Sequence, residues 1–149
     1  MEYKLIDLAI ATQYKDSFLK YYQEVIDVNK LVLNKDEINK IYDNMINYIK
    51  DNSAKIVGAF DKHDLVGFIW AYERLVNSQK RYHINYFIVD SDYRKNGIGK
   101  HLINEIYEIA KKNGVEKIEL VVTYKNQNAL HFYEKELFEI ERVVLCKDL

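Results

Sequence analysis

The first fifty residues carry apolar side chains mainly at helical spacing. Only the opening segment, Tyr3–Ile10, alternates weakly between polar and apolar positions, which predicts a strand. A helix follows from about Gln13 to Ile26, and Thr12 can cap it. Its apolar stripe consists of Phe18, Tyr21, Tyr22 and Val25. These positions predict an amphipathic helix packed on a core.

A second helix begins after a short connector, Val28–Leu33. Asn34 is its expected cap, and Glu37 stands where a capping box places its carboxylate. The apolar stripe of this helix consists of Ile38, Ile41, Met45, Ile46 and Ile49. The first third of the chain is therefore predicted to be a strand and two helices.

The period changes to that of strands after residue 53. Ala54–Phe60 and Leu65–Arg74 are apolar runs separated by a short polar turn, the pattern of a β-hairpin. Tyr82–Val89 is a third run, and it is too apolar for a strand with one face in water. We therefore expect it at the centre of the sheet.

Helix and strand alternate over the remaining residues. A turn over Ser91–Gly99 leads into a helix that Gly114 ends, with apolar positions at Ile98, Leu102, Ile103, Ile106 and Ile109. Then come a strand, a short helix and a last apolar segment, predicted over Lys117–Thr123, Asn126–Lys135 and Phe138–Lys147. The last segment fits either one strand or a pair of strands.

These elements predict an α/β fold with a mixed sheet in a single domain, residues 1–149. The strand–helix–strand unit from Tyr82 to Thr123 requires a parallel, right-handed crossover. Ligands favour the carboxyl ends of parallel strands. The loop after Val89 lies at such an end and is the first place to look for a site.

Composition narrows the possible functions. A 149-residue chain with 48% apolar and 30% charged residues is typical of a globular domain. Its net charge of −1 gives no general attraction to nucleic acid or to anionic membranes. Cys146 is the only cysteine and the four histidines show no close ligand spacing, so we expect neither disulfide nor metal. Without an apolar run of membrane-spanning length or a signal-like start, a cytoplasmic protein is expected.

The turn after Val89 has the chemistry of an anion site. A strand ends, a basic turn with Arg94, Gly97 and Gly99 follows, and a helix begins at once. Free N–H groups and the helix dipole favour negative charge at such a helix start. Glycine lets a phosphate approach the main chain closely. By itself this pattern is equally compatible with an ordinary strand-to-helix turn.

Two motifs together resemble the GNAT family of acetyltransferases. Arg94, Gly97 and Gly99 match its pyrophosphate-binding Arg/Gln-x-x-Gly-x-Gly/Ala motif. The segment from Asn126 to Lys135 is similar to its Asn-x-x-Ala-x-x-x-Tyr-Glu-Lys segment. Two departures stand out: Ser91 replaces a frequent proline, and Glu136-Leu137-Phe138 lacks the glycine that usually follows the last helix.

The resemblance implies the family's fold and its coenzyme. The implied order is β-α-α-β-β-β-α-β-α-β, with six or seven strands and helices on both faces. Acetyl-CoA would pair its pantetheine arm with the backbone of Ile88 and Val89, where two parallel strands splay apart. Its pyrophosphate would lie on the N–H groups of the turn and helix start, with Asn126 as a further contact. The coenzyme-binding residues of that turn are Arg94, Lys95, Asn96, Gly97, Ile98, Gly99 and Lys100.

The resemblance also implies direct acetyl transfer to a primary amine of a small molecule or peptide. Tyr133 matches the family's general acid, and a backbone N–H near Val89 would stabilise the oxyanion. The carboxylate that often acts as base is absent, because Asn85 and Tyr86 stand there. Glu73 is the first choice for the base and His83 the second. Cys146 is expected to be a small buried apolar residue rather than a nucleophile.

Two functions remain compatible with the sequence. One is an active N-acetyltransferase, and the other is an acyl-CoA-binding sensor that keeps the fold without turnover, which the missing strand carboxylate favours. The sequence does not identify the acceptor amine. Tyr21, Tyr22 and the connector Val28–Leu33 could line its pocket, or the two tyrosines could lie in the core. We expect no nucleic-acid partner and no membrane partner, and a homodimer is possible.

Overall fold

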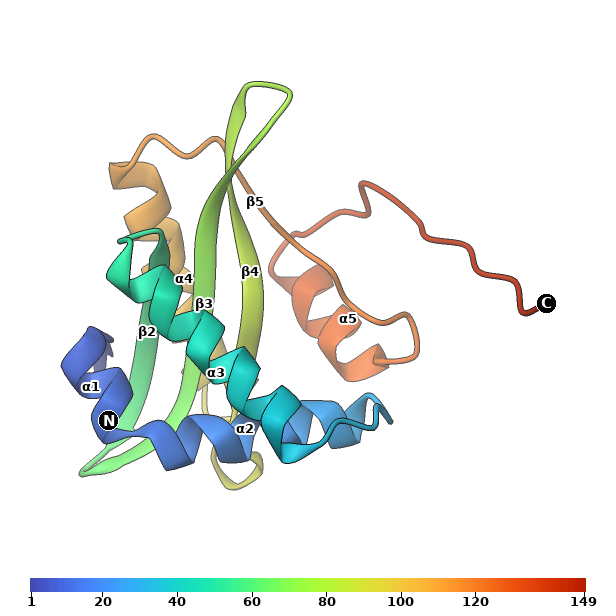
Figure 1. Cartoon of the computed structure of the whole chain (residues 1–149). Coiled ribbons are helices and arrows are strands. Elements are labelled where there is room, and N and C mark those ends of the chain that lie inside the picture. Colours follow the sequence, from blue (N-terminus) through green and yellow to red (C-terminus); the bar gives the residue numbers. More distant parts are fainter.

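The computed structural model describes residues 1–149 as helices around one twisted sheet (Figure 1). The elements are β1 (Glu2–Leu5), α1 (Leu8–Gln13), α2 (Lys15–Val28), α3 (Lys35–Lys50), β2 (Ala54–Asp61), β3 (Asp64–Val76), β4 (Gln79–Val89), a 3₁₀ turn η1 (Ser91–Tyr93), α4 (Ile98–Lys112), β5 (Lys117–Leu120) and α5 (Gln127–Lys135). The predicted mixed α/β architecture is confirmed.

The sheet has the strand order β1-β2-β3-β4-β5. Only the β4–β5 pair is parallel, as the crossover through α4 requires, and the other pairs are antiparallel. The five strands are fewer than the six or seven expected. The difference lies at the C-terminus, where residues 139–149 are extended but pair with no strand.

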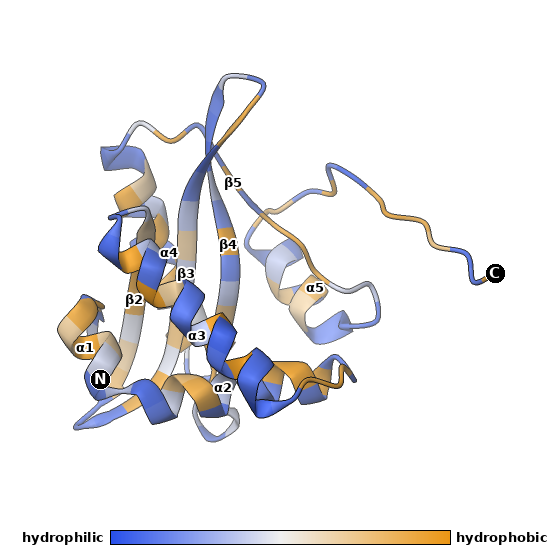
Figure 2. Ribbon diagram, in the orientation of Figure 1, coloured by the Kyte–Doolittle hydropathy of each residue, from blue (hydrophilic) through white to orange (hydrophobic).

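Two apolar clusters cover the two faces of the sheet. One joins α1, α2 and α3 to side chains such as Phe68 and Trp70 of β3. The other joins α4 to residues such as Ile69 and Ala71, and α5 contributes to it through Phe132 and Tyr133. Neighbouring residues of β3 thus enter opposite clusters, as the period of two in a strand requires. The helices in Figure 2 accordingly carry apolar stripes between polar ones.

The N-terminal elements differ from the prediction. The expected strand Tyr3–Ile10 ends at Leu5, and Asp7 caps α1 by accepting a hydrogen bond from the N–H of Ile10 at 2.9 Å. Thr12 is therefore inside a helix rather than a cap, and its hydroxyl donates to the Leu8 carbonyl. The Asp7 side chain caps the helix by binding the N–H three residues later, and this signal outweighs the weak alternation of the segment.

The caps of α3 and α4 follow the prediction. Asn34 and Glu37 form a complete capping box, each side chain accepting from the other residue's N–H. Gly114 follows α4 with φ of 67°, the left-handed conformation that glycine adopts without steric cost. Each of these caps is formed by residues within a few positions of one another, so it can be predicted without knowing the tertiary contacts.

The end of α5 is less regular. Leu137 adopts φ of 65° directly after the helix, in the place where a glycine is usual. Its N–H still closes the turn by donating to the Glu134 carbonyl at 3.0 Å. The turn thus forms without glycine. The β-carbon of Leu137 makes this left-handed backbone conformation less favourable, which destabilises the folded state.

Candidate active site

The parallel strands β4 and β5 separate part-way along β4, at the edge of the sheet that β5 forms. Their register runs from Arg81 opposite Lys117 to Ile84 opposite Leu120 and then stops. β4 continues to Val89, paired only with β3 on its other side. A bulge between Trp70 and Ala71 leaves Asn85 without a register partner at this point. The backbone edge of β4 from Asn85 to Val89 is thus open toward β5, and Ile88 and Val89 lie on it.

The turn after β4 presents a row of free donors. The N–H groups of Lys95, Asn96, Gly97, Ile98, Gly99 and Lys100 have no acceptor in the protein, and the first N–H to close α4 is that of His101, which donates to the Gly97 carbonyl. The positive end of a fifteen-residue helix lies at the same place. This arrangement suits a ligand with several anionic oxygens.

The two glycines of the turn have different structural roles. Gly97 has φ of 77°, and a β-carbon there would meet no atom within 4 Å. The space above it is open, so a ligand can reach the main chain. A β-carbon on Gly99 would lie 3.4 Å from the Phe132 ring of α5. Gly99 therefore lets α4 and α5 approach each other.

Polar side chains fix the shape of the turn. Arg94 folds back, and its Nε donates to the Val89 carbonyl at 2.9 Å. Asn96 donates to the Tyr93 carbonyl, and Lys95 adopts φ of 64°. All three residues lie in the predicted turn. The Arg94 side chain connects the end of β4 to the turn through its hydrogen bond to Val89.

Asp90 is a structural residue of the site that the sequence reading missed. Its carboxylate accepts from Lys20 at 3.1 Å, from the Tyr21 hydroxyl at 3.2 Å and from the Asp92 N–H at 3.0 Å. Burial alone would raise the pKa of Asp90, but these donors outweigh it and hold the pKa below its usual value. Asp90 thus ties α2 to the end of β4. A signal was present, since an Asp two residues before an N–H commonly closes a turn.

Tyr133 lies beside the open part of β4. Its ring packs against Phe87, Phe132 and Phe138, with the Phe87 ring centroid 6.3 Å away. Its hydroxyl makes no hydrogen bond within the protein. Burial, with a smaller contribution from Tyr107, raises its pKa well above that of a free phenol. The phenol therefore stays protonated throughout the neutral range.

Asn126 begins α5. Its side-chain oxygen accepts from the Ala129 N–H at 3.2 Å, which makes it the helix cap. The amide NH₂ makes no hydrogen bond within the protein and is available to a ligand.

Glu73 is not brought to this place. It lies opposite Tyr82 and forms a 3.3 Å ion pair with Lys80, near the β3–β4 hairpin. Val89 is seven residues farther along β4, about 23 Å at about 3.3 Å per residue. The role of Glu73 as the base stays a prediction, and its register position is one residue from that of His83.

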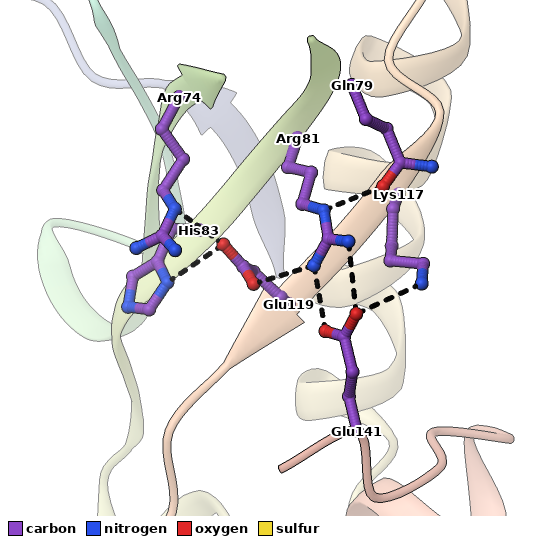
Figure 3. Close-up of polar contacts among 7 residues, drawn as sticks. All are labelled: Arg74, Gln79, Arg81, His83, Lys117, Glu119 and Glu141. Atoms are coloured by element: carbon purple, nitrogen blue, oxygen red, sulfur yellow. Dashed lines mark hydrogen bonds and ion pairs between the residues drawn. The ribbon is translucent and has the colours of Figure 1, made fainter. Parts of the chain in front are cut away.

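His83 lies immediately before the divergence of the strands. It is opposite Glu119 of β5, and its Nδ1 is 3.6 Å from the Glu119 carboxylate (Figure 3). The His83 side chain is only 15% exposed and packs against Tyr72. Burial is the main cause that lowers its pKa; Glu119 opposes this shift and Arg74 adds to it. His83 is therefore neutral near pH 7.

Glu119 is the centre of a polar cluster on this face of the sheet. Arg74 and Arg81 contact its two oxygens at 2.7 and 3.2 Å (Figure 3). Arg81 also forms a two-pronged pair with Glu141 at 2.8 and 3.0 Å. This bond, despite the opposing effect of desolvation, lowers the pKa of Glu141 to about 2. Sequence reasoning did not find the cluster, because its members come from separate segments.

The proposed acceptor residues are divided between core and surface. Tyr21 and Tyr22 are buried in the α2–β3 cluster, and the Tyr21 hydroxyl donates to the Leu65 carbonyl at 2.8 Å. They are core residues rather than pocket walls. The connector between α2 and α3 exposes Val28, Leu31 and Val32 instead.

Three further observations concern the cysteine, metal binding and membrane insertion. Cys146 is exposed, which corrects the expectation that it is buried. No cluster of three or more His, Cys, Asp or Glu side chains is arranged to hold a metal ion. No helix has both the length and the apolar character needed to traverse a bilayer.

Comparison with protein families gives one match that covers most of the chain. Residues 13–137 match the profile of the Acetyltransferase (GNAT) family. Among curated proteins, an uncharacterised N-acetyltransferase of Methanocaldococcus jannaschii is 44% identical over 61 residues, 41% of this chain and 27% of that protein. An uncharacterised N-acetyltransferase of Bacillus subtilis is 29% identical over 89 residues, 60% of this chain and 57% of its own. The chain thus matches about a quarter and just over half of these two relatives.

Solved structures share the fold at low sequence identity. A tetramutant of a Bacillus halodurans protein superposes with a TM-score of 0.85 at 17% identity, covering both chains completely. A predicted acetyltransferase of Clostridium acetobutylicum, solved with acetyl-CoA, gives 0.79 at 15% identity over 97% of this chain and 95% of its own. A putative acetyl transferase of Pyrococcus furiosus gives 0.76 at 23% identity, over 99% and 100%.

Proposed function

This chain belongs to the GNAT family of acetyltransferases, and from that premise we propose that it transfers the acetyl group of acetyl-CoA directly to a primary amine of a small molecule or peptide. The observation that carries the proposal is the coincidence of two features at one end of β4. One is the row of unpaired N–H groups from Lys95 to Lys100, and the other is the open edge of β4 beyond Ile84.

Both features fit acetyl-CoA. The free N–H groups and the helix dipole suit its pyrophosphate, and open space above Gly97 allows close approach. The edge of β4 beyond Ile84, which carries Ile88 and Val89 and has no partner strand, suits an extended pantetheine arm that adds to the sheet as a strand does. The amide of Asn126 is a further donor for the coenzyme. Bound there, acetyl-CoA would supply the activated thioester. The protein's own groups would stabilise the oxyanion, remove a proton from the amine and protonate the leaving sulfur.

Tyr133 is the proposed general acid. Its protonated hydroxyl lacks a protein partner and lies beside the open part of β4 through the Phe87 contact. A neutral phenol can donate a hydrogen bond, and then its proton, to the sulfur as negative charge develops on it. The N–H groups on the open edge of β4 near Val89 are the proposed donors to the oxyanion.

His83 is the proposed general base in place of Glu73. It lies one residue before the strands separate and beside Glu119 of β5, whereas the Glu73 carboxylate is paired with Lys80. A neutral imidazole can accept the proton that the attacking ammonium loses. The basic turn and the His83 region belong to opposite halves of β4, so coenzyme and acceptor would meet at the divergence.

A coenzyme sensor without turnover is the competing function. The absence of a carboxylate at Asn85 and Tyr86 favours it, and the His83–Glu119 pair favours catalysis. The two functions share the coenzyme site and differ only in turnover.

One experiment tests both parts of the proposal. Calorimetry with CoA should show binding to the wild type and at least a tenfold loss for Gly97→Val, because a left-handed valine is strained and turns the N–H groups away. Gly114→Val is the matched control: it carries the same left-handed strain with open space around it, at the other end of α4. Equal affinity of Gly97→Val and the control would refute the site.

Turnover is then measured with acetyl-CoA and a panel of polyamines, amino acids, aminoglycosides and peptide N-termini. Thiol release with at least one amine supports the enzyme. Tight CoA binding without release for any amine supports the sensor.

A further inference from the structure

Two buried polar atoms of His83 and Glu119 face each other without a hydrogen bond. Only three buried side-chain nitrogen or oxygen atoms in the protein lack a hydrogen-bond partner, and two of them are His83 Nδ1 and Glu119 Oε1. These two atoms lie 3.6 Å apart, each on a side chain that is largely buried. A buried polar atom without a partner is unfavourable, so the structure favours a bond between them.

The Glu119 carboxylate is held in place by two arginines. Arg74 Nε contacts Oε1 at 2.7 Å, and a terminal nitrogen of Arg81 contacts Oε2 at 3.2 Å (Figure 3). These two cations fix the direction of the carboxylate. A carboxylate oxygen has two lone pairs, so Oε1 can accept from an Nδ1–H of His83 while it stays in contact with Arg74. A small rotation of the imidazole ring would shorten the gap to about 3.0 Å, the length of an N–H···O bond.

The second ring nitrogen of His83 is free. Nε2 makes no hydrogen bond within the protein and, unlike Nδ1, is not buried. Figure 3 shows it turned away from the Glu119 carboxylate. His83 lies one residue before β4 and β5 separate. A free imidazole nitrogen therefore lies next to the place where coenzyme and acceptor would meet.

We propose that Glu119 is the positioning residue of His83: its carboxylate accepts the Nδ1–H of the imidazole and so leaves the Nε2 lone pair free to take a proton from the attacking amine. This inference rests on the proposed transferase function. An N–H bond of the amine breaks as one forms at Nε2, and the amine keeps the electron pair that attacks the thioester. Nδ1 retains its proton throughout, so the positive charge of the imidazolium develops beside the Glu119 carboxylate. With the proton on Nε2 instead, this nitrogen could not accept another.

The first test identifies the tautomer of His83 in the resting protein and needs no acceptor amine. NMR spectra that correlate the ring nitrogens with the ring C–H protons of isotope-labelled protein distinguish a protonated nitrogen from an unprotonated one. The signals of His83 are assigned by their loss in His83→Gln. Above neutral pH we expect the wild-type imidazole to carry its single proton on Nδ1. A proton on Nε2 would overturn the proposal, whether or not the protein acetylates an amine.

The second test compares Glu119→Met with Glu141→Met. Both variants lose a carboxylate that contacts Arg81, but only Glu119 faces His83. Glu119→Met should move the ring proton toward Nε2 and lower kcat about tenfold or more, because Nδ1–H loses its acceptor. The acidic limb of kcat/KM should also shift to lower pH, since Glu119 opposes the effect of burial and of Arg74 on the pKa of His83. Glu141→Met should keep the tautomer, kcat and the limb of the wild type.

The outcomes separate this proposal from the function on which it rests. Retention of the Nδ1 proton in Glu119→Met, or the same change of tautomer in Glu141→Met, would overturn the positioning role. Absence of thiol release with every amine, together with the expected tautomers, would refute the transferase and still support the bond between His83 and Glu119. Circular dichroism verifies that each variant is folded. If Glu119→Met does not fold, the wild-type spectrum still decides, because it depends on no change at Glu119.

Discussion

At the scale of single residues, the site depends on groups whose environment changes their chemistry. Tyr133 and His83 are ordinary residues in sequence, and this chain has thirteen tyrosines. Burial keeps the phenol protonated and the imidazole neutral, the forms that an acid and a base need.

We predict that Tyr133→Phe lowers kcat about a hundredfold or more and leaves the affinity for CoA nearly unchanged. In the proposed mechanism the lost hydroxyl protonates the leaving sulfur, whereas the ring packing on Phe87 and Phe138 is kept. Steady-state kinetics and calorimetry measure the two quantities. Tyr107→Phe is the control, since Tyr107 is a partly buried tyrosine of α4 to which we assign no role; an equal effect in both variants would contradict the assignment.

The second residue-scale prediction concerns pH. Because burial lowers the pKa of His83 below that of an ordinary imidazole, kcat/KM should fall only as the pH decreases through this lowered pKa. The charged and titratable groups that face His83 are Glu119, Arg74, Arg81 and Tyr72, and of these Glu119 alone raises its pKa.

The pH profile of His83→Gln checks this prediction. The acidic limb should disappear and the plateau should drop, whereas Glu73→Gln should keep the wild-type profile. Retention of the limb in His83→Gln would mean that water or the substrate disposes of the proton.

At the scale of elements, capping residues fix where the helices begin and end. Asp7, Asn34 and Asn126 each cap a helix, and Gly97 and Gly114 border α4 in the left-handed conformation. Leu137 after α5 adopts the left-handed conformation without being glycine, as Lys30 after α2 also does.

We predict that Leu137→Gly stabilises the protein by about 0.5–1 kcal/mol. Removing the β-carbon relieves a left-handed strain of about 1–2 kcal/mol, and the greater freedom of glycine in the unfolded chain offsets part of it. Leu137 is 87% exposed, so little burial is lost. Urea denaturation measures the free energy of unfolding, and Leu75→Gly, in a strand, should destabilise instead. A Leu137→Gly variant less stable than wild type would refute the strain.

At the scale of the whole molecule, the sheet separates two apolar clusters. Ile26 belongs to the α2 side and Ile106 to the α4 side, and both are buried. Side chains on opposite faces of a sheet share no direct contacts, so their contributions should be independent.

We therefore predict that Ile26→Val and Ile106→Val each cost about 0.5–1.5 kcal/mol and that the double variant costs their sum to within about 0.5 kcal/mol. Chemical denaturation of the four proteins gives the three differences. A larger deviation from additivity would indicate that the two faces are coupled through the strands.

The sequence alone determined the elements whose signals are local. The capping box at Asn34, the stop at Gly114, the hairpin around residues 61–64 and the parallel crossover through α4 follow from neighbours within a few positions. The turn with free N–H groups was predictable for the same reason, because its donors are consecutive residues of one strand–turn–helix segment.

Only the tertiary structure decided which distant side chains meet. It showed that Glu73 pairs with Lys80 and that His83 lies beside Glu119 just before β4 and β5 separate, a point that strand register fixes and no local pattern encodes. It gathered Arg74, Arg81, Glu119 and Glu141 from four separate segments. It also left residues 139–149 without a partner strand despite their strand-like pattern. A strand needs hydrogen-bonding partners from elsewhere, whereas a helix finds them within itself, so strand pairing is what a sequence specifies least by itself.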